Sequence, residues 1–404
     1  MRVAILGGGF LAVCTALELS RRGVRVQLFD RGSGLLQQAA TRNEGKIHLG
    51  YVYANTDFRT AEKMIFGALR FLPLLRRWIG DEADRIPVSD EFIYAVHRDS
   101  MLPFAAIQAH ANRVSTWIDR DGGLFDYPGK PSRSRCSVLS KTEIGRHFDT
   151  GLITAAIRTP ERAIRVDQVA EVLRQAVAAE PLITVNLHSE VVGASTNGNK
   201  DVVISIHRGD LIETDHFDHV VNALWDGRLR LDATLGMRPD RQWLWRMKYA
   251  ITCRLTRNSC AVPSFTIVLG PFGDVVNFGV GRLYLSWYPA CLDGLSHEIS
   301  PPEWRRDPDP QKSGQVVTKS VAALSAIAPE LAGIDAPGTA EFMVRGGIIY
   351  ALARTDIDDL HSRLHQRHAV GVKSQDAWHS VDPGKYSLAP SFAIEVADRI
   401  RLAN

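Results

Sequence analysis

Residues 1–30 constrain the fold of this chain more than any other segment. An apolar stretch, Arg2–Leu6, runs into three consecutive glycines, and an apolar segment with helical spacing follows from Phe10 to Arg22. A second apolar stretch then ends in Asp30. The order of strand, glycine turn, helix, strand and acid is that of the βαβ unit that binds dinucleotides, and it predicts a Rossmann-like sheet.

Each part of this unit has a physical role towards a bound dinucleotide. Gly7 permits the tight turn, Gly9 lets the backbone approach a pyrophosphate, and the positive end of the helix faces the phosphates. Asp30 stands where an acid accepts a hydrogen bond from a ribose hydroxyl. An ordinary βαβ unit without a ligand is the alternative, but three glycines at a helix start are unfavourable unless something must approach them. The cofactor-binding residues predicted here are Gly7, Gly8, Gly9, Phe10, Leu11, Asp30 and Arg31.

Length and charge bound the class of protein. The chain has 404 residues, 45% hydrophobic and 23% charged, with a formal net charge of +3. A chain of this length is long for one core, so two lobes are expected. The basic residues are scattered rather than run together, which argues against a nucleic-acid partner.

The five cysteines form no CxxC pair and no metal-ligand spacing, so we expect reduced thiols and no metal site. The first strand begins almost at Met1, which leaves no room for a signal peptide. No apolar run reaches the roughly 18 residues of a membrane span. We therefore expect a cytoplasmic protein, with peripheral membrane attachment left open.

The order of the predicted elements indicates how the domains are built. Nucleotide-type strand and helix patterns occur at both ends of the chain and in its middle, where the buried strand 220–223 lies. Antiparallel-type strand patterns fill Trp243–Tyr288. We expect an α/β fold in which a Rossmann-like domain is assembled from separated segments. A second, α+β domain with a mainly antiparallel sheet is inserted between them.

Three segments together resemble the D-amino-acid-oxidase-like family of FAD-dependent oxidoreductases, which includes glycine oxidase and the glycerol-3-phosphate and 2-hydroxyglutarate dehydrogenases. They are the βαβ unit, the sequence Gly-Lys-Ile-His-Leu-Gly at 45–50, and the sequence Asp-Pro-Gly-Lys-Tyr-Ser at 382–387. The Val-Val-Asn-Ala element at 220–223 is similar as well. The resemblance implies FAD as the cofactor. It also implies an FAD-binding domain at 1–57, 150–238 and 341–404 and a substrate-binding domain at 58–149 and 239–340.

The resemblance also implies further residues at the FAD. Two glycines after Arg345 permit close backbone approach to a planar ring. The further cofactor-binding residues predicted on this basis are Asn43, Gly45, Lys46, Ile47, Val191, Ala223, Gly347, Gly384, Lys385, Tyr386 and Ser387.

The 382–387 segment can also be interpreted without the family. Proline and glycine precede a predicted helix, so free N–H groups and Lys385 stand at a helix N-terminus and form an anion-binding site. Such a site stabilises the negative charge of a reduced flavin near N1 and the C2 carbonyl. The alternative is a plain helix start with an exposed lysine.

His48 follows the glycine-rich stretch that the resemblance places beside the flavin. Three functional roles are open: it orients substrate, it acts as a base, or it attaches covalently to the flavin, as a histidine does in dimethylglycine-oxidising relatives. A hydrogen-bonded structural histidine is an equal alternative.

A carboxylate anchor is expected on the inserted sheet. Arg282, Tyr284, Ser286 and Tyr288 alternate along one strand and share a face, which suits a carboxylate; a solvent-facing surface gives the same alternation. Arg345 is a second anchor candidate, with a structural salt bridge as its alternative. Solvent exposure is expected for Lys248. We interpret His361, His365 and His368 as surface residues rather than metal ligands. The predicted catalytic residues are His48, Arg282, Tyr288 and Arg345.

Together these features predict an FAD-dependent oxidoreductase that oxidises a C–H bond beside an amine or hydroxyl of a small, carboxylate-bearing substrate by hydride transfer to flavin N5. Oxygen or a quinone is the expected electron acceptor, and the chain is expected to be a monomer or homodimer. A flavin monooxygenase and a non-catalytic FAD-binding subunit are the alternatives. The Gly-Asp-Ala sequence of the monooxygenases is absent, as are the second glycine fingerprint and the CxxxxC of disulfide reductases.

Overall fold

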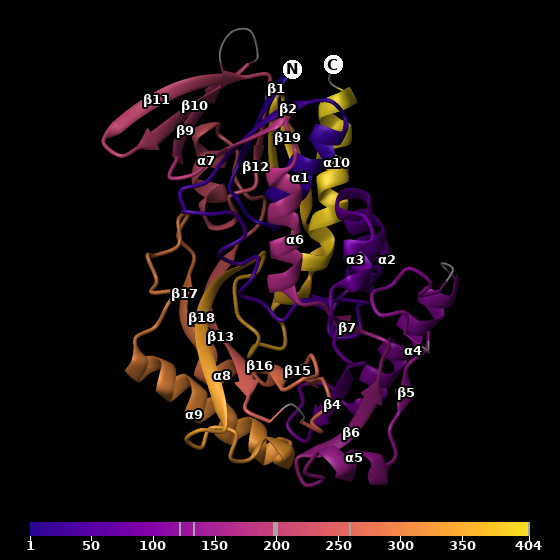
Figure 1. The fold of residues 1–404 in the computed structure, drawn as a ribbon. Coiled ribbons are helices and arrows are strands. Elements are labelled where there is room, and N and C mark those ends of the chain that lie inside the picture. Colours follow the sequence, from indigo (N-terminus) through magenta and orange to yellow (C-terminus); the bar gives the residue numbers. More distant parts are fainter. Residues whose placement is uncertain (121–122, 132–133, 197–200, 258–259, 403–404) are drawn as a thin grey trace.

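The computed structural model describes residues 1–120, 123–131, 134–196, 201–257 and 260–402. Two lobes are stacked along the long axis of the molecule. The nucleotide-type sheet and its helices form one lobe, and a large sheet with helix α9 forms the other (Figure 1). Among the described residues, no helix combines the length and apolar character needed to cross a membrane.

The first lobe is built on a six-stranded sheet with the strand order β19-β20-β12-β1-β2-β8. All neighbouring pairs are parallel except β19 with β20. The carboxyl ends of β1, β12 and β20 therefore meet at one edge, where ligands bind to such sheets. The strands are β1 Arg2–Leu6, β2 Arg25–Phe29, β8 Ile183–Asn186, β12 His219–Asn222, β19 Gly371–Gln375 and β20 Trp378–Asp382.

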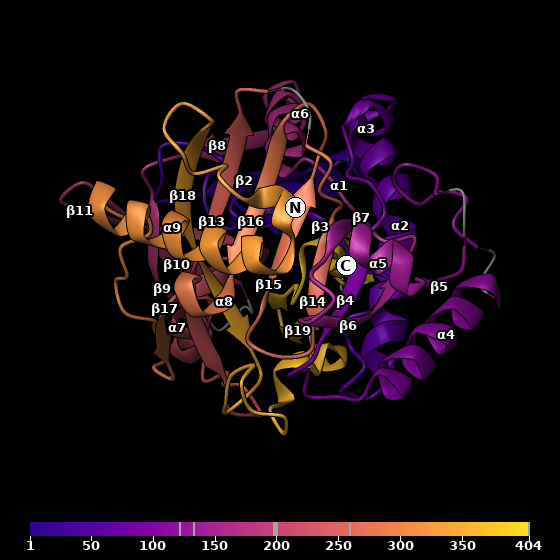
Figure 2. The ribbon, with the colours of Figure 1, turned by 90° about the horizontal axis from the view of Figure 1, so that it is seen from below.

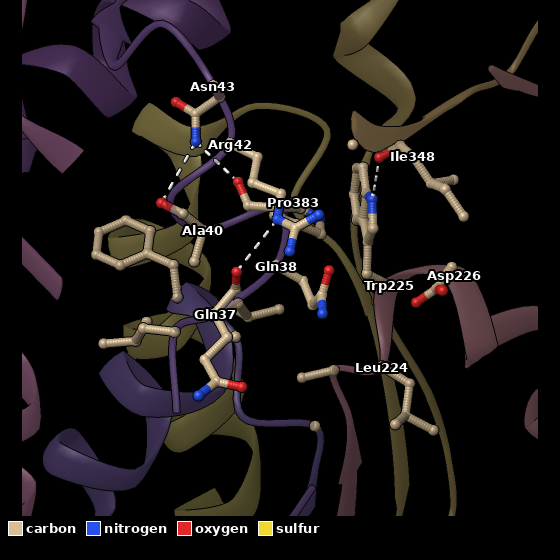
Figure 3. A pocket seen from close by; sticks show the side chains of 18 of the residues that line it. Gln37, Gln38, Ala40, Arg42, Asn43, Leu224, Trp225, Asp226, Ile348 and Pro383 are labelled. Carbon is tan, nitrogen blue, oxygen red and sulfur yellow. Dashed lines mark hydrogen bonds between the residues drawn. The ribbon is translucent and has the colours of Figure 1, made fainter. Parts of the chain in front are cut away.

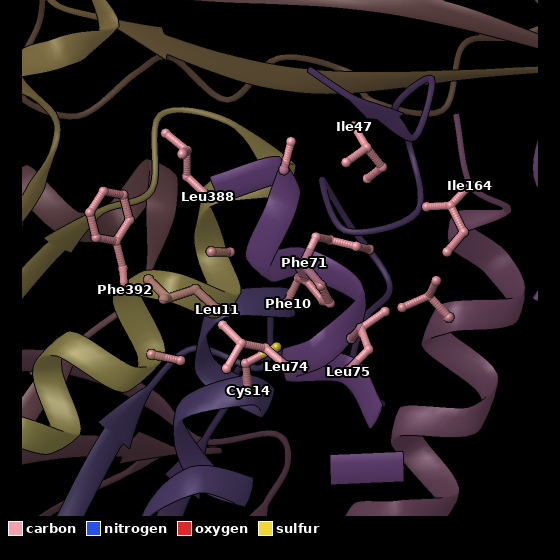
Figure 4. Packing of buried hydrophobic residues seen from close by; sticks show 14 of the residues in the cluster. Phe10, Leu11, Cys14, Ile47, Phe71, Leu74, Leu75, Ile164, Leu388 and Phe392 are labelled. Atoms are coloured by element: carbon pink, nitrogen blue, oxygen red, sulfur yellow. The ribbon is translucent and has the colours of Figure 1, made fainter. Parts of the chain in front are cut away.

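Helices cover one face of this sheet because their apolar residues recur at helical spacing. Helix α1 (Phe10–Arg21) is buried along almost its whole length against α10 (Ala389–Leu402) and α6 (Val166–Ala178). Helix α2 (Arg59–Ile79) packs on α10 and contributes Phe71 to the same core as Phe10 (Figure 4). This packing fixes the N-terminus of α1 at the sheet edge.

A small antiparallel sheet packs over the opposite face. It consists of β9 (Glu190–Thr196), β10 (Val202–Arg208) and β11 (Leu211–Phe217). Its inward residues join Ala4, Leu6 and Val220 in one apolar cluster. Helix α7 (Arg228–Thr234) follows β12 and closes the lobe beside β9.

The second lobe is a nine-stranded sheet with the order β17-β13-β16-β15-β14-β4-β6-β5, in which β18 pairs with β13 over twelve residues. It is antiparallel except for β14 with β4. Alternate residues of β13 pack with α9 (Pro310–Ile327) on the outer face (Figure 2). The strands are β4 Ile93–His97, β5 Ser137–Val138, β6 Ile153–Arg158, β13 Leu244–Leu255, β14 Phe265–Val268, β15 Gly273–Asn277, β16 Arg282–Trp287, β17 Leu292–Ser296 and β18 Ala340–Ala351.

The remaining elements complete the described part of the chain. The α-helices among them are α3 Glu82–Arg85, α4 Phe104–Arg120, α5 Lys141–His147 and α8 Tyr288–Cys291, and the strands are β3 Lys46–Ile47 and β7 Arg162–Ala163. The 3-10 helices are η1 Trp225–Gly227, η2 Pro329–Leu331, η3 Arg363–His365, η4 Arg367–Ala369 and η5 Tyr386–Leu388.

The predicted α/β fold class, with an inserted and mainly antiparallel sheet, is confirmed. Three segments lie elsewhere than the expected domain boundaries put them. Helix α2, which falls in the expected substrate-binding segment 58–149, packs on α10 of the nucleotide lobe. Strands β6 and β18, which fall in the 150–238 and 341–404 segments, pair within the large sheet and not within the six-stranded one. Strand β18 pairs with β13, which lies nearly a hundred residues earlier in the chain. The local sequence does not indicate which distant strand will be its partner.

Candidate active site

A cavity of about 370 Å³ lies between the two lobes, at the carboxyl edge of the six-stranded sheet. It extends from the glycine turn at 7–9 to the Gly384–Tyr386 turn, and residues of β13, β16 and β18 line its other side. Its position matches the place where parallel sheets bind ligands. The two turns at its ends are the motifs that the sequence singled out.

The glycine turn leaves room for a ligand. Gly7 has φ +100°, and a Cβ there would lie 2.9 Å from the carbonyl oxygen of Ala223, so a side chain is disfavoured twice. A Cβ at Gly9 would meet nothing within 4 Å, so this residue faces open space. Gly9 caps α1 without a side-chain hydrogen bond, which leaves the first N–H groups of the helix for an anion.

Asp30 shapes the turn that it faces. Its Oδ2 accepts a hydrogen bond of 2.5 Å from the Gly8 N–H, and its Oδ1 accepts one of 2.6 Å from the Gly32 N–H. Asp30 also lines the cavity, so each oxygen retains a lone pair for a further donor. The contact of Asp30 with a ribose hydroxyl stays a prediction.

Ion pairs cross the mouth of the cavity and join the two lobes. Figure 3 shows Gln38 and Arg42 on one side of this mouth and Trp225 and Asp226 on the other. Arg306, from the loop after β17, pairs with Asp226, and Arg42 lies 3.2 Å from Asp307 of the same loop. The Trp225 indole N–H donates to the carbonyl of Ile348 at 2.7 Å. This clasp, Arg306–Asp226 with Arg42–Asp307, holds the large sheet over the cavity.

We expect Arg306→Ala to speed cofactor release about fivefold, because a half-buried ion pair that closes the mouth is worth about 1 kcal/mol. Dilution of the holoenzyme, followed by flavin fluorescence, measures the rate. Arg305→Ala is the control, since Arg305 pairs with Asp309 on the exposed side of the same loop. An unchanged release rate in Arg306→Ala would show that the clasp does not limit release.

The turn at the inner end presents a half-buried lysine, Lys385. The Gly384 N–H donates to Asp382 Oδ1 at 2.9 Å, and η5 then leads into α10. Lys385 lines the cavity, and burial lowers its pKa to about 8 although Glu44 opposes the shift. Tyr386 stacks on Phe10, with ring centroids 4.1 Å apart. Helix α10 begins at Ala389, directly after η5.

His48 lies in the cavity wall between two carboxylates. Its Nε2 is 3.7 Å from Glu44 and its Nδ1 is 3.5 Å from Glu161, and neither ring nitrogen has a hydrogen-bond partner among the described residues. Burial raises the pKa of Glu161, but His48 and Lys46 more than offset this, so the net shift is downward. Glu161 also accepts from the Leu49 N–H at 2.6 Å, which fixes the loop that carries His48.

The large sheet presents one polar face to the cavity. Arg246, Lys248 and Ala250 alternate on β13 with residues that pack under α9, and both Lys248 and Tyr284 line the cavity. Solvent exposure had been expected for Lys248, so this expectation is corrected. The Lys248 ammonium lies 5.1 Å from the ring centroid of Tyr288.

The structure does not bring the predicted anchors Arg282, Tyr288 and Arg345 to the cavity. Arg282 is exposed at the start of β16, and Arg345 is exposed on β18. The Tyr288 hydroxyl donates to Asp356 and accepts from Arg246 at 3.2 Å, so its hydrogen bonds are already made. Alternation fixes which face a residue is on, but the position of the cavity along the strand decides which residue reaches it.

Arg367 is a buried cavity arginine that sequence analysis missed. It is 4% exposed, its Nη1 donates to the carbonyl of Tyr350 at 2.9 Å, and its Nε has no partner in the described structure. His365 beside it is half-buried, not a surface residue, and burial followed by the charge of Arg367 lowers its pKa to about 3. The run 361–368 is rich in charge and histidine, which made it resemble a solvated loop.

Most of the other predicted residues line this cavity: Gly7, Gly8, Gly9, Phe10, Leu11, Asp30, Arg31, Asn43, Lys46, His48, Val191, Ala223, Gly347, Gly384, Lys385 and Tyr386. Three predicted cofactor contacts do not. Gly45 has φ +71° and packs against the carbonyl of Ile164, Ile47 is fully buried in the core, and the Ser387 hydroxyl is buried behind the turn. These three residues pack on the side of the 43–48 and 384–387 loops that faces away from the cavity.

These residues fit a flavin dinucleotide. The uncapped start of α1 and the open space at Gly9 suit a pyrophosphate. At the opposite end stand the half-buried Lys385 and His48, whose ring nitrogens have no hydrogen-bond partner among the described residues. Sheet topology and cavity together indicate a dinucleotide-binding protein. Residues 2–335 match the FAD dependent oxidoreductase family, DAO, and the chain belongs to that family. The predicted family and FAD cofactor are thus confirmed.

Solved structures share the fold over nearly the whole chain. Glycine oxidase from Geobacillus kaustophilus has a TM-score of 0.70 with 16% identity, over 99% of this chain and 95% of that one. Iminodiacetate oxidase (IdaA) from Chelativorans sp. BNC1 has a TM-score of 0.69 with 15% identity, again over 99% and 95%. At these identities the likeness shows the fold alone.

A curated relative matches part of the sequence. The FAD-dependent monooxygenase FPY4 of Fusarium mangiferae is 25% identical over 236 residues, which are 57% of this chain and 51% of that protein. The chain therefore spans about half the length of the curated relative it matches.

Proposed function

We propose that the protein oxidises a C–H bond beside an amine or hydroxyl of a small carboxylate-bearing substrate, by transfer of a hydride to N5 of FAD. The observation that supports this proposal is the pair of cations in the cavity wall, Arg367 and Lys248. Among the described residues, neither has an ion pair with a carboxylate.

The charges in the cavity favour an anionic substrate. Lys385 faces Glu44, and Lys46 lies 3.7 Å from Asp274, so these two lysines have internal counter-charges. Within the described part of the chain, Arg367 donates only to the backbone carbonyls of Tyr350 and Gly384. A buried guanidinium without a counter-ion is costly, and a substrate carboxylate that pairs with it removes that cost.

We assign His48 the role of proton acceptor from the substrate amine or hydroxyl. Its ring lies between two carboxylates, Glu44 and Glu161, and neither ring nitrogen has a hydrogen-bond partner among the described residues, so both are available to the substrate. The large sheet and the clasp exclude water from the reacting atoms. Acid precipitation tests the covalent alternative, because flavin that stays with the pellet would be attached to the protein.

Lys385→Met tests the anion site at the flavin. We expect a lower flavin midpoint potential and weaker formation of a sulfite adduct, because Lys385 supplies the positive charge that stabilises a negative flavin. The expected loss is partial, since backbone N–H groups of the same turn remain. Dye equilibration measures the potential. An unchanged potential in a fully loaded variant would remove this role from Lys385.

Anaerobic mixing with a panel of acids tests the function directly. Amino and hydroxy acids should bleach the flavin absorbance, and the matching amides, which lack the carboxylate charge, should not. Bleaching by uncharged substrates alone would contradict the carboxylate anchor. The same reaction reoxidised with oxygen or with a quinone identifies the acceptor, and light scattering separates monomer from homodimer.

Monooxygenation is the second candidate, favoured by the name of the 25% identical relative. It predicts one oxygen atom from O₂ in the product, whereas an oxidase returns both as peroxide. Mass spectrometry of the product formed under labelled O₂ separates the two. A lack of turnover with any acceptor would instead favour the non-catalytic flavin-binding subunit.

A further inference from the structure

We propose that Arg228 is a positioning residue that sets the electron affinity of the flavin without touching it. Arg228 contacts the Asp382–Lys385 turn on the side away from the cavity, and its positive charge pairs with the buried carboxylate of Asp382 at the start of that turn. This inference rests on the proposed placement of the flavin beside Lys385. Arg228 itself is absent from the cavity wall.

Arg228 occupies the start of α7, directly behind the carboxyl end of β20. Its side chain is buried, and its Nη1 donates to Ser380 Oγ at 3.2 Å and to Asp232 Oδ2 at 3.4 Å. Its Nη2 lies 3.8 Å from Asp382 Oδ2. The guanidinium also lies 5.0 Å from the ring centroid of Tyr350. One planar fork therefore joins α7 to the end of β20.

The other oxygen of Asp382 fixes the turn. Asp382 Oδ1 accepts from the Gly384 N–H at 2.9 Å, and Gly384 has φ +61°, a conformation in which glycine carries little strain. The carbonyl of Gly384 accepts from Arg367 Nη1 at 3.5 Å on the opposite side. The turn that carries Lys385 is thus held between Arg228, behind it, and Arg367, in the cavity.

The two carboxylates that face Arg228 are not equivalent. Asp232 also accepts from Asn222 at 2.8 Å and from the Trp378 indole at 2.9 Å, so neutral donors stabilise its charge. In the described structure Asp382 has one ion pair, the one with Arg228. Without Arg228, the buried carboxylate of Asp382 would lose its one ion-pair partner in the described structure, and its negative charge behind the flavin-facing turn would oppose electron uptake more strongly.

The test compares charge changes of opposite sign in the FAD-loaded protein. Equilibration with a reference dye under slow reduction gives the ratio of reduced flavin to reduced dye. We expect Arg228→Gln to lower this ratio about tenfold. Asp382→Asn should raise it, because the amide keeps an oxygen for the Gly384 N–H and loses the charge. Arg228→Lys should restore most of the ratio.

Lys373→Gln is the matched control. It removes a cation from β19, the neighbour of β20, but Lys373 is exposed and pairs with Asp240 away from the turn. Its ratio should stay at the wild-type value. A role of Arg228 in stability alone would lower the melting temperature of Arg228→Gln and leave the dye ratio unchanged, which would overturn the proposal.

A parallel measurement on Lys385→Met separates this proposal from the proposed function. If Lys385→Met moves the ratio and Arg228→Gln does not, the positioning role is wrong while the flavin placement stands. If neither variant moves it, the flavin placement itself is wrong. Should Arg228→Gln fail to hold FAD, Asp382→Asn decides, because a ratio that does not rise in that variant contradicts the proposal.

Discussion

Gly9→Leu is expected to lose FAD binding by about a thousandfold or more, while the protein keeps its fold. The expected effect is this large because a Cβ at position 9 would point into open space, where the pyrophosphate is predicted to approach the backbone. The backbone of Gly9 has φ −79°, which any residue adopts, so the substitution adds no strain. Isothermal titration of the apoprotein with FAD measures the change.

Two companion variants separate ligand exclusion from misfolding. Gly9→Ala adds one methyl group and should weaken FAD binding less than leucine does. Gly7→Ala should lower the melting temperature of the apoprotein, because φ +100° and the nearby carbonyl of Ala223 both disfavour a side chain. Normal FAD binding by Gly9→Leu would place the pyrophosphate elsewhere.

The sequence predicted those parts of the site whose residues lie close together in the chain. The glycine turn, α1 and Asp30 lie within one βαβ unit, so their spacing alone predicted their places around the cavity. The turn that carries Lys385 could also be predicted from the sequence, because proline and glycine before a helix form a local pattern. Each of these motifs is completed by residues that are near neighbours in the chain.

The substrate side of the cavity depends on pairings that local sequence does not record. Lys248 and Tyr284 reach the cavity because β13 pairs with β16 and lies across from the nucleotide lobe. The alternation on β16 was right as a pattern, yet Arg282 stands at the outer end of that strand. Arg367 lies in η4, a 3-10 turn whose burial comes wholly from tertiary packing. Such residues have no periodic signal.

Two arginines test where the substrate carboxylate binds: Arg367, which lines the cavity, and Arg282, which the sequence predicted but which lies outside it. Arg367→Met should lower kcat/KM for a carboxylate substrate about a hundredfold to a thousandfold, mostly through KM, because it removes the cation that pairs with the substrate in a buried site. The flavin spectrum should stay nearly intact, since methionine keeps much of the side-chain volume. Steady-state kinetics on amino and hydroxy acids measures the loss.

Arg282→Met is the matched control, with the same change of residue and charge on an exposed side chain outside the cavity. It should turn over substrate within about twofold of the wild type, as surface substitutions usually do. If Arg282→Met loses activity and Arg367→Met does not, the carboxylate lies on the outer part of β16 instead. If both variants retain normal KM values, neither Arg367 nor Arg282 anchors the substrate, and Lys248 becomes the next cation to test, since it lines the same cavity without a carboxylate partner in the described structure.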